Sequence, residues 1–288
     1  MRDWALVGVP LYTLASYRGM GEAPTSLRKA GLGRVLDGAT DLGNIELPPL
    51  KEDATEGKVK NLSNFKEATS RIYNATKSVQ AEQVFVLGGE CSVAVGALAG
   101  LSEVFSGKPG MLWMDAHGDF NTPETSPSGY VGGMCLAMAC GRSPGLGLAM
   151  GGSGYSLGEE RLVLVGSRAL DPPEVAALSE SPAKLYTSRQ VKKAGVADVA
   201  EEAARHLDNR SDWIVCHLDV DVTDPELIPS VNYPTPGGLT LEEATLIVRT
   251  LLKTEKMKVL ELAAYNAAKD RRGTSARKIV DLIKTVFS

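Results

Sequence analysis

The sequence predicts an α/β protein in which a parallel sheet carries helices on both of its faces. Short apolar runs alternate along the chain with longer segments of helical periodicity, as in strands joined by crossover helices. Most of these runs are continuously apolar, which is typical of parallel strands buried on both faces. The 288 residues are enough for a three-layer core, and no long linker or repeat divides them, so one domain is the simplest interpretation.

Strands are predicted at the apolar runs. Six runs are strong: Trp4–Val9, Val84–Leu87, Met111–Met114, Leu162–Val165, Trp213–Leu218 and Val259–Leu262. Two weaker candidates are Thr40–Ile45 and Lys184–Tyr186. The helical segments between them are Asn64–Ala81, Ser92–Leu101, Asp198–Leu207 and Leu241–Lys253.

The last helix is the clearest element, because its apolar residues form a single stripe. The members of this stripe are Ile279, Val280, Leu282, Ile283, Val286 and Phe287. Thr274 is the candidate N-cap, since a hydroxyl at that position accepts a bond from a free N–H of the first turn. Ser143–Gly158 is rich in glycine and uncharged, and we interpret it as a loop.

Composition excludes several classes of protein. Hydrophobic residues make up 43% and charged residues 23%, which excludes disorder, collagen and coiled coil as the main architecture. The net charge of −4 gives no footprint for nucleic acid or for an anionic membrane surface. Trp4–Tyr17 is too short for a spanning helix, and Arg2 is offset by Asp3, so we expect a cytoplasmic protein without a signal peptide. The four scattered cysteines do not form a disulfide framework.

Unusual residues follow three of the strong strands, where α/β sheets bind their ligands. Asp115, His117 and Asp119 alternate after one strand, so on an extended chain they point to one side with neighbours ~6.6 Å apart. Asp219 and Asp221 have the same spacing after another strand. The third strand is followed by Gly-Gly-Glu-Cys-Ser, residues 88–92, which brings a thiol to the same end of the sheet.

Four converging carboxylates would repel each other and would be costly to desolvate. Two divalent cations resolve this conflict, because carboxylates can bridge metals ~3.5–4 Å apart that together activate water. Other interpretations exist for single residues. An Asp-x-Asp pair can cap a turn, and Cys91 can be a small buried side chain. His217 lies on the same strand face as Asp219 and is either structural or a partner of a ligand. His206 lies on a polar helix and is expected to be exposed.

The motifs together resemble the arginase/agmatinase, or ureohydrolase, superfamily over nearly the whole chain. The matching stretches are Asp-Ala-His-Gly-Asp-Phe-Asn-Thr-Pro (115–123), Leu-Asp-Val-Asp (218–221), Asp224-Pro225 and Gly-Gly-Glu-Cys-Ser (88–92). Residues 118–125 with Gly129-Tyr130 and Gly132–Met134 are most similar to the members that hydrolyse Nω-hydroxyarginine. The resemblance implies a single three-layer α/β/α domain over 1–288 with a parallel sheet of about eight strands, and a homo-oligomer.

The resemblance also implies a dinuclear manganese site that activates water for attack on a guanidine or amidine carbon. By position, one metal takes Cys91, Asp115, Asp119 and Asp219. The other metal takes Asp115, His117, Asp219 and Asp221. Asp119 and His117 are the candidate catalytic residues. The amino-acid end of the substrate is matched to Asn121, Ser128 and Asp171.

Three positions depart from the family pattern. Cys91 stands where the family usually has histidine, and a thiolate shifts the metal preference from Mn²⁺ toward Zn²⁺ or Fe²⁺. Gly132 stands in place of a second histidine. Ala264 stands in place of a glutamate that pairs with the guanidinium, an interaction worth roughly 1.5–3 kcal/mol. Glu261 replaces that glutamate only if the strand end bends.

The leading hypothesis is a dinuclear-metal hydrolase of linear C–N bonds in an arginine-related amino acid such as Nω-hydroxyarginine. Ala264 argues against arginine itself and leaves a neutral amide or amidine as an alternative substrate. A different hypothesis is a catalytically silent, arginase-like binding subunit. The lost glutamate and histidine favour it, and the intact aspartate set argues against it.

Overall fold

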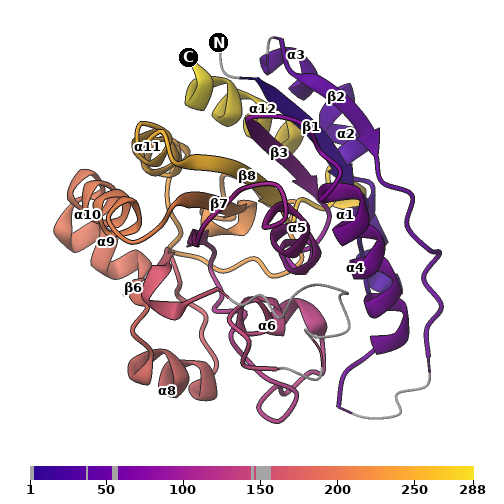
Figure 1. Cartoon of the computed structure of the whole chain (residues 1–288), viewed down its shortest axis with the longest axis horizontal. Coiled ribbons are helices and arrows are strands. Elements are labelled where there is room, and N and C mark those ends of the chain that lie inside the picture. Colours follow the sequence, from indigo (N-terminus) through magenta and orange to yellow (C-terminus); the bar gives the residue numbers. More distant parts are fainter. Residues whose placement is uncertain (1–2, 37, 54–57, 144–145, 147–156) are drawn as a thin grey trace.

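Within the described part of the chain, eight strands lie parallel in one sheet, in the order β2-β1-β3-β8-β7-β4-β5-β6 (Figure 1). The computed structural model describes residues 3–36, 38–53, 58–143, 146 and 157–288. The strands are β1 (Trp4–Val9), β2 (Thr40–Asn44), β3 (Gln83–Gly88), β4 (Pro109–Met114), β5 (Leu162–Val165), β6 (Lys184–Tyr186), β7 (Trp213–Asp219) and β8 (Met257–Ala263). Every predicted strand is therefore confirmed, the two weaker ones included.

Helices cover both faces of the sheet, which confirms the three-layer α/β/α architecture (Figure 1). One face packs against α2 (Ala23–Lys29), α3 (Leu32–Val35), α10 (Val196–Asp208), α11 (Leu241–Leu252) and α12 (Thr274–Phe287). The other face packs against α4 (Leu62–Thr76), α5 (Val93–Leu101) and α6 (Cys135–Ala139). The described residues also form the short helices α1 (Arg18–Gly21), α8 (Pro172–Glu180) and α9 (Ser188–Ala194). No helix in the described part of the chain has the length and apolar character needed to cross a membrane.

Three local predictions are wrong: the end of α4, the N-cap of α12 and the exposure of His206. Helix α4 ends at Thr76 rather than Ala81, because the hydroxyls of Thr76 and Ser78 bond to carbonyls one turn back and compete with further helix. Thr274 is the first residue of α12 and not its N-cap, since Gly273 holds that position at a left-handed φ of 64°. The carboxylate of Asp270 instead accepts the N–H groups of Thr274 and Ala276.

His206 is buried rather than exposed. Its ring lies against the turn Glu159–Arg161, and its Nε2 is 2.9 Å from the carbonyl oxygen of Glu160. The charged residues around it along α10 conceal this contact, because they face the solvent side of the helix. The loop predicted over Ser143–Gly158 lies largely outside the described residues.

The topology brings the motif residues together. Strands β3, β8, β7 and β4 are neighbours at the centre of the sheet. Because these strands are parallel, the residues that follow them meet at one edge. Within the sheet, Trp113, His217 and Glu261 lie side by side in register on β4, β7 and β8. Side chains alternate between the two faces of a strand, and these three point to the sheet face covered by α5 and α6.

The turn after β3 requires glycine at position 89. A Cβ atom there would lie 2.0 Å from the carbonyl oxygen of Leu11, which belongs to the backbone after β1. We expect Gly89→Ala to lower the free energy of unfolding by about 1–3 kcal/mol, because backbone must move to accept the methyl group. Guanidinium denaturation measures the change. The matched control is Gly33→Ala in α3, where a Cβ meets nothing within 4 Å, and equal losses for both variants would contradict this account.

Candidate metal centre

A cavity of about 150 Å³ opens at the carboxyl edge of the sheet. Every side chain that the sequence predicts for the site lines it: Cys91, Asp115, His117, Asp119, Asn121, Ser128, Asp171, Asp219 and Asp221. These residues come from the ends of three strands and from the connection between β4 and α8. The structure therefore brings together residues that are up to 130 positions apart in the chain, as between Cys91 and Asp221.

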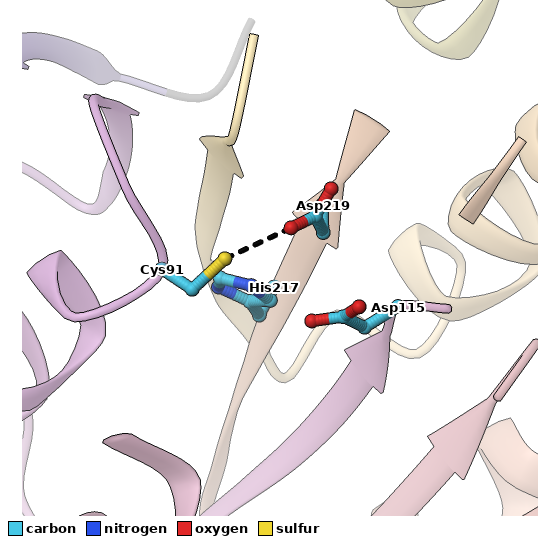
Figure 2. Close-up of side chains that lie close together, drawn as sticks. All are labelled: Cys91, Asp115, His217 and Asp219. Carbon is cyan, nitrogen blue, oxygen red and sulfur yellow. Dashed lines mark hydrogen bonds between the residues drawn. The ribbon is translucent and has the colours of Figure 1, made fainter. Parts of the chain in front are cut away.

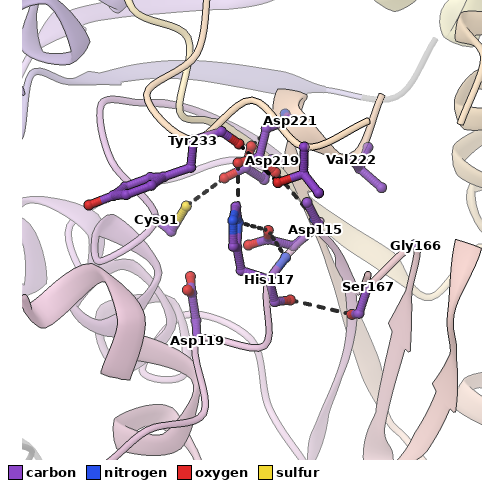
Figure 3. Close-up of polar contacts among 12 residues, drawn as sticks. Cys91, Asp115, His117, Asp119, Gly166, Ser167, Asp219, Asp221, Val222 and Tyr233 are labelled. Carbon is purple, nitrogen blue, oxygen red and sulfur yellow. Dashed lines mark hydrogen bonds and ion pairs between the residues drawn. The ribbon is translucent and has the colours of Figure 1, made fainter. Parts of the chain in front are cut away.

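Two groups of side chains have donor atoms close enough to hold a metal, with all atoms of each group within 4.8 Å of one another. The first group contains Cys91, Asp115 and Asp219, as expected, together with His217 (Figure 2). The second group contains Asp115, His117 and Asp221 (Figure 3). Asp115 belongs to both groups, in keeping with a bridging role. Asp119 belongs to neither group.

Hydrogen bonds fix the orientation of these ligands. The Cys91 thiol donates to Asp219 Oδ2 at 2.9 Å, and Asp219 Oδ1 accepts the backbone N–H of Asp221 at 2.6 Å. His117 Nδ1 lies 3.2 Å from Asp115 Oδ1 and 3.3 Å from Asp221 Oδ2 (Figure 3). The indole N–H of Trp113 donates to the other oxygen of Asp115 at 3.2 Å. Each carboxylate is thus oriented before any metal binds.

Burial and mutual repulsion oppose ionisation of the acidic groups of the cluster. Burial, together with the charges of Asp221 and Asp115, raises the pKa of Asp219 well above its usual range. Burial and the neighbouring aspartates likewise raise the pKa of the Cys91 thiol. Burial alone would lower the pKa of His117, but its bonds to Asp115 and Asp221 outweigh burial and raise the pKa to about 12. One imidazolium is too little positive charge for this many anions.

The donor set fits divalent metal ions. Thiolate, imidazole and carboxylate are the side chains that bind such ions, and the excess of buried negative charge is what two cations would neutralise. Arg168 lies nearby, but its guanidinium does not pair with the carboxylates. Instead it donates to backbone carbonyls of Gly166, Asp221, Val222, Thr223 and Thr235.

Hydrogen bonds also hold the part of the cavity wall that contains Asn121, Ser128 and Asp171. Asn121 Nδ2 donates to Asp171 Oδ2 at 2.9 Å, and Ser128 Oγ accepts the N–H of Tyr130. Asp171 is the N-cap of α8, and Glu174 of the same capping box accepts the N–H groups of both Asp171 and Phe120. This arrangement ties the loop after β4 to the start of α8, so the three predicted substrate contacts face one cavity.

Tyr130 explains the glycine at position 132. A Cβ atom on Gly132 would lie 2.3 Å from Cε1 of the Tyr130 ring, so the tyrosine occupies the space that a side chain at 132 would need. The hydroxyl of Tyr130 donates to Glu90 Oε2 at 2.9 Å, and Glu90 also accepts bonds from Thr13 and Ser92. In this chain the Tyr130 ring therefore occupies the space in which a side chain at position 132 would lie.

Glu261 does not replace the missing carboxylate. Strand β8 continues regularly to Ala263, and Glu261 is buried beneath the cavity, where its Oε1 lies 3.3 Å from His217 Nδ1. Ala264 lines the cavity in a left-handed conformation, with φ of 67°. The cavity thus has no carboxylate at the position that pairs with guanidinium in the family pattern.

Sequence reasoning missed two further residues of the site. Tyr233 lines the cavity with its ring 5.7 Å from that of His117, and nothing in its surrounding sequence distinguishes it from a surface tyrosine. Arg168 holds the turn that carries Asp221. The sequence could have predicted this residue, because Arg168 follows the buried strand β5 in the segment Gly-Ser-Arg. A cation there lies at the same edge of the sheet as the carboxylates that follow the other strands.

The parallel sheet, the cavity at its carboxyl edge and the two donor groups in that cavity define the class of the protein as a metal-dependent ureohydrolase. Comparison with known proteins gives the family. The sequence profile of the Arginase family matches residues 2–288. Arginase of Bacillus caldovelox is 34% identical over 100% of this chain and 98% of its own length, and arginase of Bacillus subtilis is 32% identical over 98% and 97%. The native structure of the B. caldovelox enzyme superposes with a TM-score of 0.93 at 33% identity, covering 100% and 99% of the two chains. The chain belongs to the arginase family.

The Arg168 guanidinium should be a main support of the metal centre. We expect Arg168→Ala to lower the free energy of unfolding by more than about 2 kcal/mol, because the carbonyls of Asp221, Thr223 and Thr235 lose the guanidinium that they accept from. Hydrogen exchange should rise in the turn 221–223. Arg71→Ala is the control, since Arg71 makes only an exposed ion pair with Glu67 and should change stability by no more than about 0.5 kcal/mol. Similar losses in the two variants would show that Arg168 has no special role.

Proposed function

We propose that this protein hydrolyses a C–N bond in an arginine-related amino acid by means of two metal ions. The observation that carries this proposal is the pair of donor groups that share Asp115 at one cavity. When bound, two divalent metals activate water and polarise the scissile group. The chain supplies the orientation of the ligands, the burial that excludes bulk water, and the contacts to the substrate.

The proposed ligands follow the family pattern. Cys91, Asp115, Asp119 and Asp219 hold one metal, and Asp115, His117, Asp219 and Asp221 hold the other. Mn²⁺ is the family metal, and the thiol of Cys91 favours Zn²⁺ or Fe²⁺ more than an imidazole does. Asp119 and His117 face the cavity and are the proposed acceptor and donor of protons at the reacting group.

We propose Nω-hydroxyarginine as the first substrate to test, ahead of arginine. Ala264 offers no anion to a guanidinium, and Glu261 is paired with His217 below the cavity. A weakly basic hydroxyguanidine loses less from the absence of that anion than the strongly basic guanidinium of arginine does. A neutral amide or amidine is a second candidate for the same reason.

A panel of substrates tests the proposed function. Arginine, Nω-hydroxyarginine, agmatine, guanidinobutyrate and formimidoylglutamate would each be incubated with metal-loaded protein, with release of urea, hydroxyurea or formamide as the readout. Hydrolysis of hydroxyarginine faster than of arginine is expected. Metal content is measured on the same samples, and a protein that binds no metal and hydrolyses nothing would be the silent binding subunit instead.

Asp219 should be indispensable for the metals. Asp219→Ala is expected to remove bound metal and activity together while the protein stays folded, because the proposed ligand set gives Asp219 to both ions. Metal counting and circular dichroism check this result. Asp281→Ala, on the exposed face of α12, is the control and should keep both properties. Full metal content and full turnover in Asp219→Ala would rule out the dinuclear proposal.

Asn121 and Ser128 should discriminate between substrates with and without an α-carboxylate. Replacing either with Ala is expected to raise KM for amino-acid substrates roughly tenfold or more, which corresponds to about 1.4 kcal/mol of lost binding, with a smaller effect on decarboxylated agmatine. Steady-state kinetics on both substrate types measures the difference. Equal losses would argue against a grip on the amino-acid end.

We also propose that the chain acts as one domain within a cytoplasmic homo-oligomer. Light scattering after gel filtration measures the assembly.

A further inference from the structure

We infer that His217 is a ligand of the metal held by Cys91, Asp115 and Asp219, which gives that metal a thiolate, an imidazole and two carboxylates. This inference rests on the proposed dinuclear function and revises its ligand set at one place, because His217 takes the position at this metal that the family pattern gives to Asp119. His217 is the fourth member of the first donor group, and it comes from β7 two residues before Asp219 (Figure 2). An imidazole, which the family places at position 91 after β3, is thus supplied from β7, on the other side of β8.

The first observation is that His217 has unused polar atoms. Its side chain is 0% exposed, and neither Nδ1 nor Nε2 has a hydrogen-bond partner. A buried imidazole without partners costs about 1–3 kcal/mol, so a polar group that is kept in this position needs a partner. One ring nitrogen lies within 4.8 Å of donor atoms on Cys91, Asp115 and Asp219. A metal ion among these four atoms would satisfy it.

The second observation is that the ring is held in place. It stacks on Trp113 with 3.6 Å between ring centroids and 5° between planes. Its Nδ1 lies 3.3 Å from Oε1 of Glu261, within ion-pair distance although the angles do not make a hydrogen bond. A carboxylate beside one nitrogen of a metal-binding histidine orients the ring and makes the other nitrogen a better donor. Glu261 therefore orients the His217 ring and does not contact the substrate.

The third observation concerns charge. Cys91, Asp115 and Asp219 already bring three anionic groups to one ion, and a fourth anion in a dry site adds repulsion that a neutral imidazole avoids. Asp119, the fourth ligand in the family pattern, lies outside this donor group, and its Oδ2 is 3.4 Å from the thiol of Cys135. His217 is thus the better fourth donor by both distance and charge. The resulting sulfur and nitrogen content favours Zn²⁺ or Co²⁺ at this position over Mn²⁺.

Metal content of variants tests the inference. The full chain would be loaded with Zn²⁺ or Co²⁺, dialysed and analysed for metal per chain. We expect two metals in the unmodified protein and one in His217→Phe, which keeps an aromatic ring on Trp113 but has no nitrogen. Glu261→Gln should keep both metals but bind one of them about 10–100-fold more weakly. His206→Phe is the matched control, because His206 is also buried and bonds only to the Glu160 carbonyl, and it should keep both metals.

X-ray absorption at the zinc edge of the unmodified protein tests the same point without a variant. His117 alone would give one imidazole for every two metals, whereas His117 with His217 would give one per metal. Two metals in His217→Phe, or half an imidazole per metal in the unmodified protein, would overturn the inference and leave the dinuclear proposal standing. An unmodified protein that binds no metal would overturn both. If His217→Phe does not fold, the imidazole count decides.

Discussion

The structure depends on one electrostatic constraint, which is that four aspartates and a thiol are buried around one cavity at the edge of a parallel sheet. Removing these groups from water favours their protonated forms, and their mutual repulsion adds to that effect. His117 relieves only the part of the cluster around Asp115 and Asp221. Divalent cations are the physical solution that these donors fit. The arrangement that is unfavourable in the metal-free chain is therefore the arrangement that makes a strong metal site.

The surrounding fold keeps that arrangement rigid. Strands β3, β7 and β4 deliver Cys91, Asp219 and Asp115 to the same edge, and the parallel register leaves little freedom in their spacing. Arg168 binds the turn that carries Asp221 through backbone carbonyls rather than through the carboxylates. The carboxylate oxygens therefore stay available for metals, because a guanidinium paired with them would compete for the same atoms.

The departures from the arginase pattern form two connected sets. At the mouth of the cavity, Tyr130 fills the space beside Gly132 and is held by Glu90. Below the cavity, Glu261 and His217 form a buried pair, while Ala264 leaves the cavity wall without an anion. The surrounding residues of this chain therefore accommodate both departures.

The sequence by itself determined the sheet, its parallel character and nine of the residues that line the cavity. Continuous apolar runs can only be buried on both faces, and residues after parallel strands must meet at one edge. It did not determine which residues touch within that edge. Tyr233 and Arg168 were missed, and His206 was misplaced, because each depends on contacts between segments far apart in the chain. The tertiary structure alone decided that His217 lies with Cys91 in one donor group while Asp119 lies outside it. Strand register across β4, β7 and β8 contributes to those distances, and no local pattern in the sequence encodes them.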